Sequence, residues 1–337
     1  MTPFASHLLT WFHQHGSKDL PWQRDIHPYR VWVSEIMLQQ TQVKTVIPYF
    51  ERFIARFPDI QALAQASEDQ VLALWAGLGY YARGRNLHRA AQKIMTEYQG
   101  QFPLDSTQVQ GLPGLGKSTA HAILAICEGQ RLAILDGNVK RVLTRYCGIS
   151  GYPGNKKIEA QLWQIAESFL PATSLPDYTQ AIMDLGAMIC LPRNPRCAEC
   201  PVQQNCIAFA AQQTASLPTP KPKKALPTKE AAFVIAMHQG KVLLEKRPSK
   251  GIWGSLWCVP EFTTNMDLQA FIQDRVVTIL APRPHLFTHY RLILTPYVME
   301  VAQPFCHDKN HQWVALDQIA EYGLPAPILL LLRPIIK

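Results

Sequence analysis

Four cysteines within one short segment carry the most specific chemical signal in the sequence. Cys190, Cys197, Cys200 and Cys206 are separated by six, two and five residues. Soft thiolate ligands select zinc or an iron-sulfur cluster. Zinc sites usually pair two short Cys-x-x-Cys steps across a longer gap, whereas this segment has one such step between two wider ones. The spacing therefore favours a [4Fe-4S] cluster, with zinc as the alternative.

The other four cysteines are isolated among apolar neighbours. A lone cysteine in such surroundings behaves as a small buried hydrophobe, and we predict this for Cys127, Cys147, Cys258 and Cys306. The first residues do not show the basic start, apolar middle and cleavage site of a secretory signal. We therefore expect a reducing cytoplasmic compartment, without a disulfide framework.

Two carboxylates stand where acid-base chemistry is possible. Glu35 lies in the apolar run VWVSEIML, and Asp136 follows the apolar run AIL at the start of an expected helix. Burial would raise the pKa of Glu35 and let it carry a proton at neutral pH. The alternatives are an exposed structural Glu35 and a simple N-cap role for Asp136, which is compatible with a catalytic one.

A glycine-containing turn between two expected helices could bind phosphate. Residues 105–128, DSTQVQGLPGLGKSTAHAILAICE, read as a short helix, a turn with Gly114 and Gly116, and a second helix. Glycines let the backbone approach a ligand closely, and the amides at a helix start attract an anion. An ordinary turn between helices is the alternative.

These residues need a scaffold, and the periodicity predicts two kinds. Up to residue 212 apolar residues recur at helical spacing, for example in 71–77, 81–98 and 117–128. Residues 213–229 are rich in proline and lysine, which is typical of a solvated linker. Residues 230–337 change to the period of strands and read as an α+β domain.

Several elements are expected in this last domain. Strands 231–237 and 241–246 flank a turn, further strands are expected at 285–295 and 297–301, and helices at 266–279 and 316–322. No run of about 18 apolar residues exists, so we expect no membrane span.

Together the hairpin, the Asp136 helix and the cysteine segment resemble the helix-hairpin-helix DNA glycosylases with an iron-sulfur cluster. The segments LPW at 20–22, VWVSEIMLQQTQV at 31–43, GLGYYAR at 77–83 and LDGNVKRV at 135–142 are similar to adenine DNA glycosylases of the MutY type. The resemblance implies base-excision repair, with hydrolysis of the N-glycosidic bond of adenine mispaired with 8-oxoguanine or guanine. It implies a mainly α glycosylase domain at 1–212, the linker 213–229, and a Nudix-like domain at 230–337.

The resemblance also assigns roles to residues. Glu35 matches the acid that protonates a flipped adenine, and Asp136 the carboxylate that stabilises the cationic sugar. The matching DNA and substrate positions are Leu20, Trp22, Gln40, Tyr80, Gly114, Gly116, Lys117, Ser118, Asn138, Gln180 and Thr288. Gln40 and Tyr80 match residues that wedge into the base stack, and Leu20, Trp22 and Gln180 match the adenine pocket. The cluster loop would present basic residues to DNA.

One position in the hairpin bears on strand cleavage. In related bifunctional enzymes the second residue after LPGxG is a lysine that attacks the sugar, whereas here it is Ser118. Lys117 is one residue earlier, which is about 100° of helix rotation. We therefore predict a monofunctional glycosylase.

The C-terminal segment resembles a Nudix fold without its catalytic acids. Residues 251–279 contain Glu261, Asp267 and Asp274 but no Arg-Glu-x-x-Glu-Glu pattern, so we expect no magnesium-dependent hydrolysis. In the family this domain recognises 8-oxoguanine, and residues 287–290 match the loop involved, with Thr288 in place of a frequent serine.

A net charge of +8 agrees with a DNA partner but is diluted over 337 residues, of which 17% are charged. We expect a monomer that binds double-stranded DNA in the bacterial cytoplasm, at the nucleoid. The alternatives are a bifunctional glycosylase and a non-catalytic iron-sulfur DNA-binding protein.

Overall fold

The computed structural model describes residues 2–222, 225–305 and 310–335. By their contacts they form two compact units, one of Met1–Ala64 and Arg89–Lys223, the other of Gln65–His88 and Lys224–Lys337. Cys306 lies outside the described residues. No helix among the described residues is both long and apolar enough to cross a membrane.

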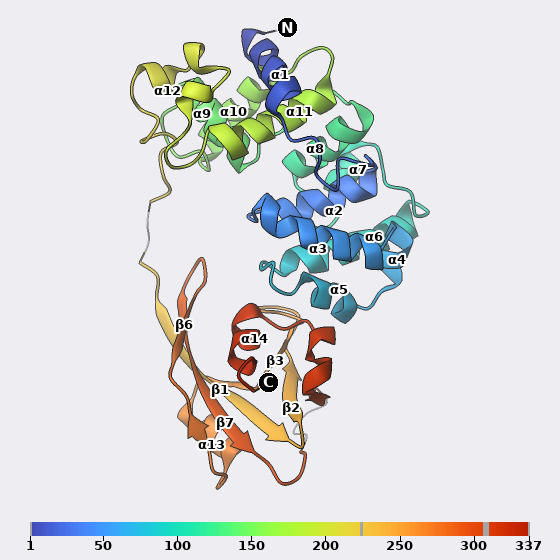
Figure 1. Ribbon diagram of the computed structural model, residues 1–337, viewed down its shortest axis with the longest axis vertical. Helices are drawn as coiled ribbons and strands as arrows, with labels where there is room; N and C mark the ends of the chain where they lie inside the picture. Colours follow the sequence, from blue (N-terminus) through green and yellow to red (C-terminus); the bar gives the residue numbers. More distant parts are fainter. Residues whose placement is uncertain (1, 223–224, 306–309, 336–337) are drawn as a thin grey trace. The chain divides into compact units, whose positions relative to one another are not determined.

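The first unit is helical (Figure 1). Its elements are α1 (Pro3–His15), α2 (Pro28–Leu38), α3 (Val43–Arg56), α4 (Ile60–Gln65), the end of α6 (Ala82–Glu97), α7 (Ser106–Gln110), α8 (Lys117–Glu128), α9 (Gly137–Tyr146), α10 (Lys156–Ser168), α11 (Leu175–Asp184), the π-helical turn η1 (Leu185–Ile189), the 3-10 turns η2 (Cys197–Glu199) and η3 (Gln203–Asn205), and α12 (Ile207–Ala210).

Helix α8 is the central helix of this unit. Its bounds are those predicted from the apolar period, and six consecutive residues from Ala120 to Ala125 are buried. A helix that is apolar on all sides must be surrounded by others, and α8 packs against α2, α7 and α11. Because α2 and α7 bring the apolar run around Glu35 and the glycine turn to the same helix, α8 organises the site.

The start of the expected linker is attached to the first unit. Leu217 is buried, and its carbonyl oxygen accepts a hydrogen bond of 2.8 Å from Arg145 Nε. The hydroxyl of Thr219 accepts from the backbone N–H of Gly151. A Pro- and Lys-rich composition therefore does not by itself predict that every residue of such a segment is solvated.

The second unit combines α5 (Glu68–Trp75) and the start of α6 with a mixed sheet. The sheet elements are β1 (Thr228–His238), β2 (Lys241–Lys246), β3 (Trp257–Cys258), β4 (Glu261–Phe262), β5 (Thr278–Ile279), β6 (Arg283–Leu286), β7 (Arg291–Glu300) and β8 (His311–Ala315), with α13 (Asn265–Ile272), the 3-10 helix η4 (Leu316–Glu321) and α14 (Ala326–Leu332). Strand β1 pairs in parallel with β7 and antiparallel with β2 (Figure 1).

In this unit the sequence predicted one hairpin correctly and one helix only in part. The predicted hairpin is confirmed, since Met237 pairs with Val242 and a left-handed backbone at Gln239 and Gly240 closes the turn. The predicted helix 266–279 is wrong beyond Ile272, because Gln273 has a φ of 52°. The side chain of Arg275 donates to the terminal carbonyls of this helix and stabilises its end.

The expected strand 285–295 is interrupted by the loop 287–290. The backbone N–H of Phe287 donates to the carbonyl of Tyr290, and Leu286 pairs with Arg291 across the turn. The residues of this loop have high β-propensity, so a sequence pattern does not reveal the turn. The expected break at Pro296 is also absent, because β7 runs through it opposite Phe233 and the proline loses only an N–H donor.

Candidate active site and cysteine loop

Glu35 and Asp136 interact in the first unit although 100 residues separate them in the sequence. Glu35 is partly buried on α2 between two buried residues, which disfavours the alternative of an exposed structural glutamate. Burial, reinforced by the negative charge of Asp136, raises the pKa of Glu35 to about 8. A carboxyl group with this pKa carries a proton at neutral pH and can donate it.

Asp136 is the N-cap of α9. Its carboxylate accepts a hydrogen bond of 2.8 Å from the backbone N–H of Val139. Burial raises its pKa, while the backbone N–H groups of Val139 and Asn138 and the charges of Arg141 and Lys140 act in the opposite direction. These donors and charges favour the ionised form of Asp136 and oppose the larger effect of burial. The site thus brings together two carboxyl groups whose pKa values are both raised by burial.

The glycine turn leads directly into α8. Gly114 has a φ of 82°, and Gly116 is the N-cap of α8 without a side-chain capping bond. A Cβ added to Gly116 would meet no protein atom within 4 Å. There is thus open space beside Gly116 at the start of a twelve-residue helix, and helix N-termini bind phosphate oxygens through their free amides.

The two residues after this turn are held differently. The Ser118 hydroxyl accepts a hydrogen bond of 2.9 Å from the backbone N–H of Leu135 and so lies beside Asp136. The Lys117 ammonium lies 4.0 Å from the centroid of the Trp163 ring and 3.6 Å from a carboxylate oxygen of Glu167. Lys117 is thus directed toward α10.

Both residues predicted to wedge into the base stack have a left-handed backbone. Gln40 has a φ of 57° and is exposed, and Tyr80 has a φ of 48° and is 48% exposed. Such conformations are strained for residues other than glycine, and they concentrate at functional sites. Gln40 belongs to the first unit and Tyr80 to the second.

The remaining predicted contact residues lie in different surroundings. Trp22 is buried, and its ring packs edge to face with that of Phe50, with 5.4 Å between the ring centroids; Leu20 is partly buried. The Gln180 amide donates to Asp184, a buried acid that also accepts from the backbone N–H of Ser17. Thr288 is exposed in the loop of the second unit, with its hydroxyl 3.4 Å from His289 Nδ1.

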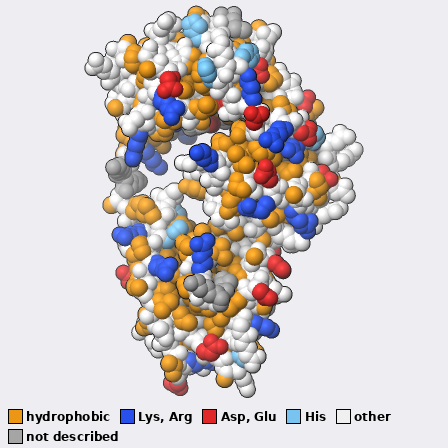
Figure 2. Space-filling view, in the orientation of Figure 1, with side chains coloured by type: hydrophobic (Ala, Val, Ile, Leu, Met, Phe, Trp, Pro, Cys, Tyr) orange, Lys and Arg blue, Asp and Glu red, His pale blue; other side chains and the backbone are white. Residues whose placement is uncertain are grey.

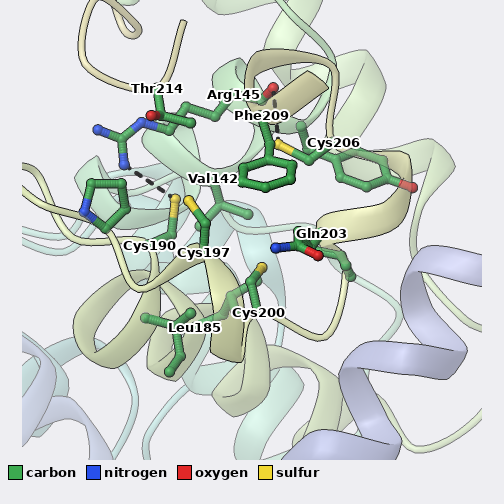
Figure 3. Close-up of a pocket in the computed structure, with 14 residues that line it drawn as sticks. Val142, Arg145, Leu185, Cys190, Cys197, Cys200, Gln203, Cys206, Phe209 and Thr214 are labelled. Atoms are coloured by element: carbon green, nitrogen blue, oxygen red, sulfur yellow. Dashed lines mark hydrogen bonds between the residues drawn. The ribbon is translucent and has the colours of Figure 1, made fainter. Parts of the chain in front are cut away.

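The four cysteines of the predicted cluster surround one cavity (Figure 3). The cavity is otherwise lined mostly by apolar side chains such as Val142, Leu185, Ile189 and Val202. Four thiols around one largely apolar cavity fit an iron-sulfur group, since soft thiolates are the usual ligands of such groups.

Two arginines of α9 connect this cavity with the N-terminal end of the helix, where Asp136 lies. Arg141 donates to Asn138 Oδ1 at 2.8 Å, to the carbonyl of Gly186 at 2.7 Å and to the carbonyl of Cys190 at 2.7 Å. Arg145, 2% exposed, donates to Cys190 Sγ (Figure 3). It also donates to the Leu191 carbonyl.

Close packing holds the π-helical turn against this network. A Cβ added to Gly186 would come within 2.6 Å of the Asn138 Cβ. The sequence did not indicate these contacts. Asn138, Arg141 and Arg145 are spaced to lie on one face of α9, but nothing local shows that the two arginines bind at Cys190, 45 to 49 residues later.

Charge alone does not mark the DNA surface. On the face that Figure 2 shows, lysine and arginine side chains occur in small groups among acidic and apolar ones.

Of the other three described cysteines, Cys258 is buried, and burial raises the pKa of its thiol. Cys127 and Cys147 are partly buried, and burial raises the pKa of their thiols to about 12 and about 11. They agree with the predicted structural role.

The helical fold, the glycine turn and the cysteine loop define a DNA glycosylase of the helix-hairpin-helix class with an iron-sulfur binding domain. Residues 33–168 match the HhH-GPD superfamily of base excision DNA repair proteins, 190–206 the iron-sulfur binding domain of endonuclease III, and 231–333 the NUDIX domain. A thermostable thymine-DNA glycosylase superposes with a TM-score of 0.56 at 27% identity, over 62% of this chain and 95% of its own.

The chain belongs to the adenine DNA glycosylases. It is 40% identical to the adenine DNA glycosylase of Buchnera aphidicola subsp. Schizaphis graminum over 96% of both chains. It is 34% identical to that of Homo sapiens, over 92% of this chain and 66% of the human one. The protein is therefore a base-excision repair enzyme that hydrolyses N-glycosyl bonds, and the predicted fold class is confirmed.

Proposed function

We propose that this enzyme removes adenine mispaired with 8-oxoguanine or guanine in double-stranded DNA, by base flipping and acid catalysis and without cutting the strand. The observation that carries the proposal is the partly buried Glu35, whose pKa is raised to about 8 beside Asp136. Glu35 lies on α2, which packs against α8, the helix that starts after the glycine turn. Membership of the adenine DNA glycosylases supplies the base that is removed.

Glu35 acts as the general acid. Adenine is a poor leaving group as an anion, so a proton delivered to a ring nitrogen lets it leave neutral. A carboxyl group with a pKa of about 8 is protonated before the reaction and becomes a carboxylate after it. Proton transfer of this kind contributes about 10²- to 10⁴-fold to a rate.

Asp136 stabilises the positive charge that develops on the sugar as the bond to adenine breaks. Its carboxylate is oriented by the Val139 N–H, and the charges of Arg141 and Lys140 favour its ionised form, so little reorganisation accompanies the charge development. It either remains an ion pair with the sugar cation or bonds to it transiently, and water then attacks C1′. Asn138, fixed by Arg141, is the neighbouring polar group at this position.

Monofunctional chemistry follows from the placement of the two residues after the glycine turn, Lys117 and Ser118. A lyase step needs a neutral amine at the sugar carbon, and the position beside Asp136 is occupied by the Ser118 hydroxyl. Lys117 is paired with Glu167 and lies over Trp163, which supports a structural or phosphate-binding role.

DNA contacts complete the proposal. Amides after Gly114 and Gly116 bind a backbone phosphate, and Gln40 and Tyr80 fill the gap that the flipped base leaves. Leu20, Trp22 and Gln180 line the adenine pocket, and the loop with Thr288 contacts 8-oxoguanine. Unpairing costs a few kcal/mol, which these contacts offset.

Cys190, Cys197, Cys200 and Cys206 would hold a [4Fe-4S] cluster, which would crosslink the loop and fix its shape.

The proposed domains are the glycosylase domain at 1–212, the linker at 213–229 and the Nudix-like domain at 230–337, although residues 65–88 pack with the second unit. We infer that the enzyme acts as a monomer on DNA at the nucleoid.

A comparison of Glu35→Gln with wild type tests the mechanism. Adenine release would be followed under single-turnover conditions on duplexes with 8-oxoguanine:adenine, guanine:adenine or thymine:adenine. Wild type should release adenine from the first two alone, and the variant should bind DNA but lose at least about 10²-fold in rate. An unchanged rate in the variant contradicts the acid role, and equal rates on all three duplexes contradict the mispair assignment.

Iron and sulfide analysis tests the proposed [4Fe-4S] cluster. Iron and acid-labile sulfide should each be found at about four per chain.

A further inference from the structure

Residues 65–88 belong to the same compact unit as the C-terminal sheet. The Tyr81 hydroxyl donates to the Leu324 carbonyl at 3.3 Å, and Lys246 forms an ion pair with Asp69. A Cβ added to Gly323 would come within 2.9 Å of Leu72. The segment that displays Tyr80 thus packs against β2 and residues 323–324 of the unit that also contains Thr288.

The loop that displays Tyr80 is held by its own neighbours. Trp75 Nε1 donates to the Gly79 carbonyl at 3.3 Å, and Arg83 Nη2 donates to the carbonyls of Leu78 and Gly79. The Arg83 guanidinium also lies 5.6 Å from the centroid of the Tyr80 ring. These contacts keep a strained, exposed tyrosine in one orientation.

Arg85, one helical turn after Tyr81, extends this framework to the turn that precedes β3. Its Nη1 donates to the backbone carbonyl of Gly254. The preceding residue, Trp253, is 8% exposed and has a φ of 55°, which is a strained conformation for a bulky side chain. Arg85 therefore fixes a peptide next to a constrained tryptophan.

Trp253 in turn packs under the loop 287–290. Its ring centroid lies 5.5 Å from that of Phe287 and 6.0 Å from that of His285, and the Phe287 and Tyr290 rings lie 4.8 Å apart. These rings flank Thr288, whose own side chain is exposed. The contacts run without interruption from the Tyr80 loop, through Arg85 and Trp253, to the loop with Thr288.

We propose that Arg85 is a positioning residue for recognition of the base opposite adenine, because its bond to Gly254 couples the Tyr80 loop to the Trp253–Phe287 support of Thr288. The inference rests on the proposed function, in which Tyr80 wedges into the base stack and the loop with Thr288 contacts 8-oxoguanine. Two loops fixed in one unit lose less conformational entropy on binding than two independent ones. Glu35 and Asp136 lie in the other unit, so the hydrolytic step itself is not affected.

The test uses Arg85→Met in the full, cluster-containing chain, since methionine keeps an unbranched stem but removes the N–H donors. The preference is measured as the ratio of single-turnover rates on 8-oxoguanine:adenine and guanine:adenine duplexes. We expect the ratio to fall about 3- to 10-fold, the effect of one lost hydrogen bond, with the guanine:adenine rate unchanged. Arg85→Lys should recover part of the ratio. Arg89→Met, at an exposed position of the same helix, is the matched control and should keep it.

Thr288→Ala and Tyr80→Ala separate this inference from the proposed function. If both lose the preference while Arg85→Met retains it, the positioning role is wrong and the proposed recognition stands. If wild type has no preference, or neither loop variant changes it, the proposed recognition itself fails. A parallel loss on both duplexes with a lower Tm would show that Arg85 only supports the fold, which also overturns the inference.

Discussion

The backbone N–H of Leu135 donates to the Ser118 hydroxyl at 2.9 Å, so the second residue after the glycine turn lies beside the residue that precedes Asp136. This bond places a hydroxyl, and not an amine, next to the segment that carries the proposed catalytic carboxylate. Lys117, one residue earlier, is held by Glu167 and Trp163 on α10.

Replacement of Ser118 by lysine should therefore create strand-cleaving activity. The new amine would stand beside Asp136 and could attack the sugar carbon to form a Schiff base. Borohydride trapping on an 8-oxoguanine:adenine duplex should give a covalent complex with Ser118→Lys and little with wild type. Strong trapping by wild type that disappears in Lys117→Met would instead show that Lys117 reaches the sugar.

Glu35→Gln should stabilise the folded protein at alkaline pH although it slows adenine release by at least about 10²-fold. The folded pKa of about 8 lies above the ordinary value of 4.5, so the folded state binds this proton more tightly. That stabilisation is complete below pH 4.5 and is lost as the pH rises through 8. Glutamine cannot ionise, so the Tm of the variant should exceed that of wild type increasingly from pH 6 to pH 9, by about 2–4 °C per kcal/mol.

The exposed Glu51→Gln variant is the control for this experiment. Its Tm difference from wild type should stay constant over the same pH range. If Glu35→Gln behaves in the same way, Glu35 is solvated and is unsuited to be the acid. The wild-type excision rate should also decline above about pH 8, as Glu35 loses its proton.

Loss of Arg141 should impair both excision and the cysteine loop. Arg141→Met leaves the carbonyls of Gly186 and Cys190 without this donor and releases Asn138. Partners that orient a reactive or metal-binding group change affinity or activity by about 10- to 100-fold. We expect a rate loss of this size together with reduced iron content, measured on the same preparation.

Lys157→Met, at an exposed position of α10, is the control. It should keep both rate and iron content near wild type. Full activity and iron content in Arg141→Met would contradict a link between the cysteine loop and Asn138.

Gly116→Ala should separate DNA binding from folding. The added Cβ meets no protein atom within 4 Å, so stability should stay close to wild type. The same methyl group would stand where a phosphate approaches the α8 amides, and affinity for duplex DNA should fall by about 1 kcal/mol, or roughly fivefold. Gln108→Ala on α7 is the control. Unchanged affinity in Gly116→Ala would exclude a phosphate at this turn.

The sequence by itself determined the features that depend on local spacing. The cysteine segment, the glycine turn, α8, the α9 cap at Asp136 and the β1–β2 hairpin follow from residues within a few positions of one another. Family segments such as VWVSEIMLQQTQV identified the class for the same reason. Turns made of strand-forming residues, as at 287–290, could not be predicted in this way.

Only the tertiary structure decided the features that depend on neighbours through space. The pKa of Glu35 is set by burial and by Asp136, and the side chain of Lys117 by residues of α10. Arg141 reaches Cys190, and residues 65–88 pack with a sheet formed more than 130 residues later. Desolvation and Coulomb interactions act over ångströms and not over sequence positions, so these relationships arise only when the chain is folded.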